Sequence, residues 1–111
     1  MLYGRYKHEF DKSISDFTKA IEIDPKYVDA YVSRGMAYSY KNQFDNAIFD
    51  YTKVIELNSR NPDAYYNRAT SYYYKEEYDR SWDDLYKAQG LGAKIDPNFI
   101  RDLKKASGRD K

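Results

Sequence analysis

The sequence predicts an all-α, right-handed solenoid of antiparallel helix pairs, and two observations lead to this prediction. First, the segment Asp11–Asp24 matches the segment Asp45–Asn58 at an offset of 34 residues. A fixed period of about 20 to 50 residues is typical of stacked repeats, in which each unit buries its apolar face against its neighbours. Second, each period holds two amphipathic helical patterns separated by a short turn. We call these helix A and helix B of a repeat.

Composition excludes most chemical functions. The chain has 111 residues, with 19 basic and 18 acidic side chains, no cysteine and one histidine, His8. These counts exclude a disulfide framework, a thiolate metal site and a histidine-rich ligand set. The first residues lack the apolar stretch of a secretory signal, and the near-neutral charge argues against nucleic-acid binding. We therefore expect a cytoplasmic interaction module with no cofactor, no metal, no membrane contact and no small-molecule substrate.

Residues 1–27 are expected to form a partial first repeat. The period places Met1 at the small-residue position of helix A, so only about two helical turns precede Phe10. His8 falls at the turn between the two helices of this repeat. The helix B that follows carries an apolar strip made of Phe10, Ile14, Phe17 and Ile21. Without a full-length helix A, we expect this strip to remain uncovered.

Residues 28–61 and 62–95 are expected to form two complete repeats. In the first of them, helix A is predicted from about Val28 to Lys41, after the start signals Asp24 and Pro25. Helix B is predicted to start with Asp45 as its N-cap and to end at Asn58. The pair Asn61-Pro62 opens the next repeat, because proline suits the first turn of a helix. Each repeat is thus a helix, a short turn and a second helix.

Residues 96–111 leave the period and are expected to form a capping helix and a tail. Gly90 and Gly92 end the preceding helix, and Asp96-Pro97 provides an N-cap followed by a proline in the first turn. An apolar stripe then runs through Phe99, Ile100, Leu103 and Ala106. Such a helix would cover the apolar face of the last helix B.

The two complete repeats resemble the tetratricopeptide repeat family, whose signature is a large residue, x2, Leu, Gly, x2, Tyr, then Ala, x3, Phe and then Pro. One repeat reads Tyr31-x2-Arg34-Gly35-x2-Tyr38 and Ala47-x3-Tyr51, and the next reads Tyr65-x2-Arg68-Ala69-x2-Tyr72 and Ser81-x3-Leu85. The small residues permit close approach of the two helices, with Gly35 facing Ala47 and Ala69 facing Ser81. The resemblance covers residues 1 to 95. It implies a protein-interaction scaffold.

Two arginines depart from the family pattern. Arg34 and Arg68 replace the usual leucine, and the helix B position that projects nearby holds Asp16, Asp50 and Asp84. Because a charge is not stable alone in a packed layer, we expect structural ion pairs. Arg34 would pair with Asp16 or Asp50, and Arg68 with Asp50 or Asp84.

The resemblance implies that helix A of each repeat lines a concave groove that holds a peptide segment of a partner protein. Tyrosine suits such recognition because it combines a rigid ring with a hydroxyl, and an asparagine can bond a peptide backbone in both directions. The alternative is that some of these tyrosines only cover neighbouring helices. The family's carboxylate clamp for chaperone tails is disfavoured, because only Asn67 matches it. The resemblance implies that the following residues line the groove: Val32, Ser33, Met36, Tyr40, Tyr66, Asn67, Thr70, Tyr73 and Tyr74.

Self-assembly and RNA binding are alternatives to peptide binding. Self-assembly into a homodimer would use the uncovered strip of the first repeat, or an exchange of helices if the turn at 74–78, which lacks Gly and Pro, straightened into one helix. RNA binding of the helical-repeat kind would need a basic track beside the aromatic residues, and that track is missing. No enzyme is expected, because the sequence has neither a nucleophile elbow nor a glycine-rich phosphate loop.

Overall fold

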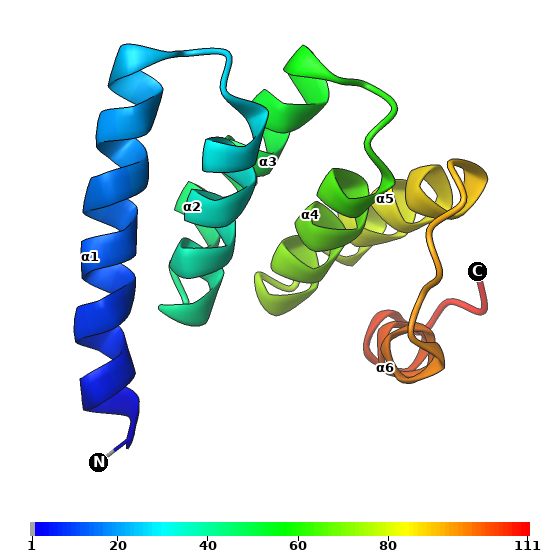
Figure 1. Ribbon diagram of the computed structural model, residues 1–111. Coiled ribbons are helices and arrows are strands. Elements are labelled where there is room, and N and C mark those ends of the chain that lie inside the picture. Colours follow the sequence, from blue (N-terminus) through cyan, green and yellow to red (C-terminus); the bar gives the residue numbers. More distant parts are fainter. Residues whose placement is uncertain (1) are drawn as a thin grey trace.

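The computed structural model describes the chain from Leu2 to Lys111, with side chains from His8 onward. Met1, at the small-residue position of the first repeat, lies outside the described residues. The described chain forms six α-helices and no strand, which confirms the predicted all-α repeat array. Figure 1 shows successive helices side by side, with the last one turned across the end of the row. The helices are α1 (Leu2–Ile23), α2 (Val28–Tyr40), α3 (Phe44–Leu57), α4 (Pro62–Tyr74), α5 (Tyr78–Gly90) and α6 (Pro97–Ser107).

Helix α1 corrects the prediction for the first repeat. It runs without interruption from Leu2 to Ile23, so the short leading helix and the turn at His8 do not exist. No glycine or proline interrupts the chain between His8 and Ile23, and the lysines and glutamates there favour helix. A turn would also leave backbone groups unpaired, whereas a continuous helix pairs them. Helix α1 is therefore one long helix whose later part serves as helix B of the first repeat.

The turns between α2 and α3 and between α4 and α5 are alike. Asn42 and Glu76 occupy the same place in them and adopt left-handed backbone conformations, with φ of 60° and 62°. In each turn the chain folds back tightly, with the Gln43 amide donating to the Tyr38 carbonyl and the Glu77 amide donating to the Tyr72 carbonyl, both at 2.9 Å. Asparagine tolerates this conformation well, but glutamate does so only at a cost. The turn at 74–78 is therefore closed and strained at Glu76.

Two of the predicted helix starts are confirmed, and one is wrong. Asn61 accepts a hydrogen bond from the Ala64 amide at 3.1 Å, and Asp96 accepts one from the Asn98 amide at 2.9 Å. Helix α3 instead begins at Phe44, with Gln43 in the cap position and no side-chain cap bond. Asp45 is thus a first-turn residue, whose negative charge is favourable near the helix N-terminus.

A close approach between α2 and α3 requires glycine at one position. A Cβ added to Gly35 would lie 2.7 Å from Cε1 of Tyr51, which is too close for real atoms. The next repeat has Ala69 and Leu85 at the corresponding positions, and both are buried. The larger Tyr51 on helix B thus faces glycine on helix A, whereas the smaller Leu85 leaves room for alanine.

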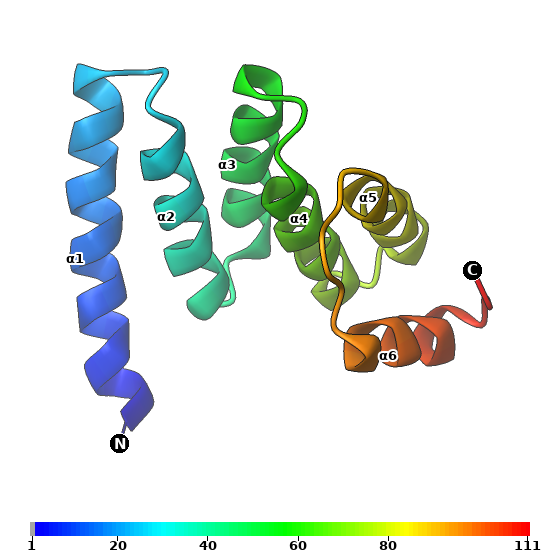
Figure 2. The same cartoon turned by 45° about the vertical axis from the view of Figure 1, so that its right-hand side comes forward.

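Helix α6 closes the far end of the array, opposite α1 (Figure 2). Leu103 is fully buried in one cluster with Ala69, Trp82 and Leu85. The Trp82 indole N–H donates to the Ser107 hydroxyl at 3.0 Å, which fixes the end of α6 on α5. Among the described residues, no helix combines the length and the apolarity needed to cross a membrane.

Candidate functional site

Two clefts lie along the helix A side of the array, one between α1 and α2 and the other among α2, α4 and the start of α3. The 34-residue period relates part of their linings, because it places Phe10 on Phe44, Met36 on Thr70 and Tyr40 on Tyr74. Ser13 and Phe17 of the first cleft correspond to residues of α3 that are buried. We call the two together the groove. The first cleft is lined by Phe10, Ser13, Phe17, Ser33, Met36, Ala37 and Tyr40, and the second by Ser39, Tyr40, Asn42, Phe44, Thr70, Ser71 and Tyr74.

A phenylalanine from helix B supports a tyrosine from the following helix A in each cleft. The rings of Phe10 and Tyr40 are stacked with centroids 5.1 Å apart and planes 12° apart. Phe44 and Tyr74 repeat this geometry at 5.1 Å and 14°. Even so, Tyr40 is 59% exposed and Tyr74 is 63% exposed. Each tyrosine ring is thus held in place by its neighbour while much of its surface remains open to a ligand.

Ion pairs hold the same edge of each cleft. Lys41 pairs with Asp11, and Lys75 pairs with Asp45. Lys75 also lies 3.1 Å from a Glu77 carboxylate oxygen, and the hydrogen bonds that Lys75 donates to the Asp45 and Glu77 carboxylates raise its pKa. Because both lysines directly follow the exposed tyrosines, the pairs fix the ends of α2 and α4. They also neutralise the charges of Lys41 and Lys75.

The structure divides the predicted groove residues into two sets. Ser33, Met36, Tyr40, Thr70 and Tyr74 line the groove. The remainder lie elsewhere or make other contacts.

Three of the remaining residues pack against neighbouring helices. Val32 packs against the buried cluster of Tyr31, Val54 and Ala64. The rings of Tyr66 and Tyr73 contact Phe99 of α6, with centroids 5.9 Å and 5.6 Å away. Tyr66 also accepts a hydrogen bond from the Asp96 amide at 3.0 Å.

Asn67 lines neither cleft, but its backbone carbonyl holds two residues that line the second one. It is half-buried, and its carbonyl accepts hydrogen bonds from the hydroxyls of Thr70 and Ser71 at 2.7 Å and 3.1 Å. Sequence reasoning missed Phe10 and Phe44, which belong to helix B rather than helix A. The signal was available, because both are large aromatic residues at equivalent places in the period.

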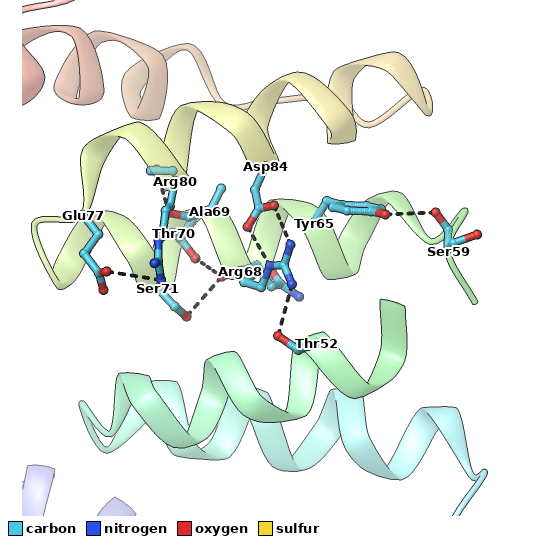
Figure 3. Close-up of polar contacts among 12 residues, drawn as sticks. Thr52, Ser59, Tyr65, Arg68, Ala69, Thr70, Ser71, Glu77, Arg80 and Asp84 are labelled. Atoms are coloured by element: carbon cyan, nitrogen blue, oxygen red, sulfur yellow. Dashed lines mark hydrogen bonds and ion pairs between the residues drawn. The ribbon is translucent and has the colours of Figure 1, made fainter. Parts of the chain in front are cut away.

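The two arginines bind aspartates of their own repeat. Arg34 donates to Asp50 through Nη2 at 2.6 Å and Nε at 2.9 Å, and through Nη1 to Thr18 at 3.2 Å. Arg68 repeats the arrangement with Asp84 at 2.8 Å and 2.7 Å and with Thr52 at 3.1 Å (Figure 3). Each arginine therefore joins helix A to helix B of the same repeat and to helix B of the repeat before it.

Burial sets the electrostatics of these pairs. Asp50 is fully buried, and loss of hydration raises its pKa although the hydrogen bonds from Arg34 act to lower it. The same hydrogen bonds raise the pKa of Arg34. Asp16, the alternative partner considered for Arg34, does not bind it and is exposed. The ion pairs thus lie within complete repeats and orient the helices that carry the groove.

Models of one protein family match three overlapping parts of the sequence. Models described as "Tetratricopeptide repeat" match residues 3–27 and 17–49, and a model described as "TPR repeat" matches residues 35–76. A comparison with curated protein sequences finds no match.

Solved structures resemble the fold over nearly its whole length. The crystal structure of MamA matches with a TM-score of 0.84 and 22% identity, covering 96% of this chain. This chain spans 63% of the length of the MamA chain. The first TPR of Spaghetti (RPAP3), solved bound to the HSP90 peptide SRMEEVD, matches at 0.80 and 21% identity, over 96% of this chain and 85% of its own. The TPR2B domain of yeast Sti1, solved as a pHsp70 complex, matches at 0.73 and 24% identity, over 91% and 82%.

Proposed function

We propose that this chain, which belongs to the tetratricopeptide repeat family, is a protein-interaction scaffold that binds a peptide segment of a partner in the groove. The observation that carries the proposal is the repeated Phe–Tyr stack, which presents Tyr40 and Tyr74 in the same orientation one repeat apart. Rings that are already held in place lose little freedom on binding, so more of the contact energy contributes to affinity. Of the structures with the same fold, one is solved bound to an HSP90 peptide and another as a pHsp70 complex, which supports a peptide segment of a protein as the ligand.

The groove favours a peptide with apolar side chains rather than an acidic tail. Each cleft offers an exposed tyrosine ring, and Met36 in the first cleft is 41% exposed. Hydroxyls of Ser33, Ser39 and Thr70 line the clefts and can bond a peptide backbone. Lys41 and Lys75, which directly follow the groove tyrosines in the sequence, are already paired with carboxylates. An apolar or aromatic side chain in each cleft, with a largely uncharged segment between, therefore fits the groove best.

The test is a selection from a displayed library of random peptides on the immobilised chain. The selected peptides are then titrated against the wild type, the double variant Tyr40→Ala/Tyr74→Ala and a control, Phe49→Ala. Phe49 is a matched control, because it is 60% exposed on α3 and lines neither cleft. Loss of two central aromatic contacts should weaken binding by about thirtyfold or more, whereas the control should stay within about twofold.

Two results would count against the groove. One is a set of peptides that bind the double variant as tightly as the wild type. The other is equal weakening by Phe49→Ala, because that change lies outside both clefts. Circular dichroism of the double variant verifies that the helices are intact, which is expected because both tyrosines are exposed.

A further inference from the structure

Helix α1 packs on α2 in the way that α3 packs on α4. Arg34 reaches Thr18 of α1 at 3.2 Å, and Arg68 reaches Thr52 of α3 at 3.1 Å. The stacked ring pairs have the same 5.1 Å separation in both places. The pairing of Lys41 with Asp11 likewise repeats in the pairing of Lys75 with Asp45. On the side that faces α2, the later part of α1 is therefore a regular helix B.

An adjoining side of α1, where a helix A of the same repeat would pack, lacks the cover that both other B helices have. Two of its residues, Ser13 and Phe17, also line the first cleft of the groove. Four positions of helix B face helix A of the same repeat, and all four are buried in α3 and in α5. In α1 three of these positions are only half-buried and the fourth, Asp16, is exposed. We call these four residues of α1 the α1 face. They are Ser13, Asp16, Phe17 and Ala20, equivalent to Ala47, Asp50, Tyr51 and Val54 in α3 and to Ser81, Asp84, Leu85 and Ala88 in α5.

The complete repeats show what chemistry covers such a face. In both of them an arginine of helix A donates two hydrogen bonds to the aspartate of helix B. The residue that follows this arginine in the sequence is small. In the last repeat the Ser81 hydroxyl also donates to the Ala69 carbonyl at 2.7 Å. Ser13 occupies the position equivalent to Ser81, so its hydroxyl can donate the same hydrogen bond to a backbone carbonyl of a helix that covers the face. The α1 face thus presents a carboxylate, a hydroxyl and apolar surface in the arrangement that an arginine-bearing helix satisfies.

We propose that the α1 face is a docking site for an amphipathic helix of another protein that carries the pattern Tyr, x2, Arg, small residue, x2, Tyr. The arginine binds Asp16, and the small residue allows close approach to Ser13 and Phe17. Charge complementarity supports this occupant, because Asp16 has no ion-pair partner among the side chains that the structure describes. The site shares Ser13 and Phe17 with the first cleft of the groove, but the proposal rests on Asp16 and on the burial pattern and does not depend on the groove function.

A second copy of this chain fits the α1 face less well. Its own helices of the required pattern, α2 and α4, already hold Asp50 and Asp84 with both arginines. Two α1 faces set against each other would bring two Asp16 carboxylates together, which is unfavourable. The homodimer expected from the sequence is therefore an alternative outcome of the test below.

The test uses a fluorescent peptide with the sequence of residues 62–75, PDAYYNRATSYYYK, added to the full chain and followed by fluorescence anisotropy. We expect binding that Asp16→Asn weakens about tenfold or more, and that Arg68→Gln in the peptide weakens equally. The charge exchange, Asp16→Arg in the chain with Arg68→Asp in the peptide, should restore much of the affinity. The single groove variant Tyr74→Ala, in the second cleft and away from α1, should bind the peptide as the wild type does. Because Asp16 is exposed, its substitution should leave the melting temperature unchanged.

Several outcomes overturn the proposal. Peptide binding weaker than about 1 mM, binding indifferent to Asp16→Asn, or binding lost in Tyr74→Ala would each contradict it. Light scattering of the chain without peptide measures its oligomeric state and provides a further test. A dimer that Phe17→Asp abolishes and Asp16→Asn leaves intact would assign the α1 face to a second copy instead.

Discussion

The substitution Arg68→Leu restores the residue that the tetratricopeptide signature expects, yet it should destabilise this protein. The change removes both hydrogen bonds to Asp84 and the one to Thr52. The Asp84 side chain is only 6% exposed, so its carboxylate cannot recover full hydration. An unpartnered buried charge costs about 3 to 5 kcal/mol, but the arginine side chain is 18% exposed, which allows some water to replace it. We therefore expect a loss of about 2 to 3 kcal/mol in the free energy of unfolding.

Urea unfolding followed by circular dichroism measures this loss, and a double-mutant cycle assigns it to the pair. Adding Asp84→Ala to Arg68→Leu should recover much of the stability, because the buried charge is then gone, giving a coupling energy above about 1 kcal/mol. Asp16→Ala is the matched control, since Asp16 holds the equivalent position but is exposed. It should change stability by less than about 0.5 kcal/mol. Additive effects of Arg68→Leu and Asp84→Ala would refute the reasoning.

Three further predictions concern packing, pH and a strained turn. Gly35→Ala should cost about 1 to 3 kcal/mol in urea unfolding because its Cβ would meet the Tyr51 ring. Adding Tyr51→Leu, which copies the Ala69 and Leu85 arrangement of the next repeat, should recover part of this loss; no recovery would contradict the packing argument. Burial raises the pKa of the Tyr51 hydroxyl above its ordinary value of 10.0. Its contribution to stability is therefore present below about pH 10 and is lost as pH rises through the raised pKa, so Tyr51→Phe should flatten the alkaline fall in the free energy of unfolding. An equally steep fall in that variant would show that other groups cause it. Finally, Glu76→Gly should raise the melting temperature, gaining about 1 kcal/mol by relieving the left-handed conformation at φ 62°, and a lower melting temperature would contradict the assigned strain.

The repeat and the cap residues made most of the fold predictable, and the first repeat shows where that reasoning fails. His8, Asn42 and Glu76 share one register, so the period alone predicts a turn at all three. Glu76 adopts a costly conformation because α5 packs back on α4, and this packing compensates for the strain. His8 has no such packed helix pair around it, so the helix continues through it. Local propensity favours a helix at both places, so the tertiary contact between α4 and α5 accounts for the turn at Glu76.

The candidate site was predictable in part for a related reason. Tyr40 and Tyr74 follow from their place in the repeat, because equivalent helices hold equivalent surroundings. Tyr66 and Tyr73 contact α6, which has left the period, so its path across the array was not encoded in the repeat pattern. The support that Phe10 and Phe44 give to the groove tyrosines comes from the contact between neighbouring repeats, which a reading of helix A alone does not include.

The central claim is that a partner peptide contacts the open face of the stacked tyrosines. Photo-crosslinking tests it most directly, with a benzophenone amino acid replacing Tyr40 in one variant and Phe49 in another. The two positions are matched in exposure, at 59% and 60%, so solvent access alone would label both equally. We predict that a peptide selected on the wild-type chain crosslinks at position 40 and not at position 49. Equal crosslinking at both positions, or crosslinking at position 49 alone, would contradict the account.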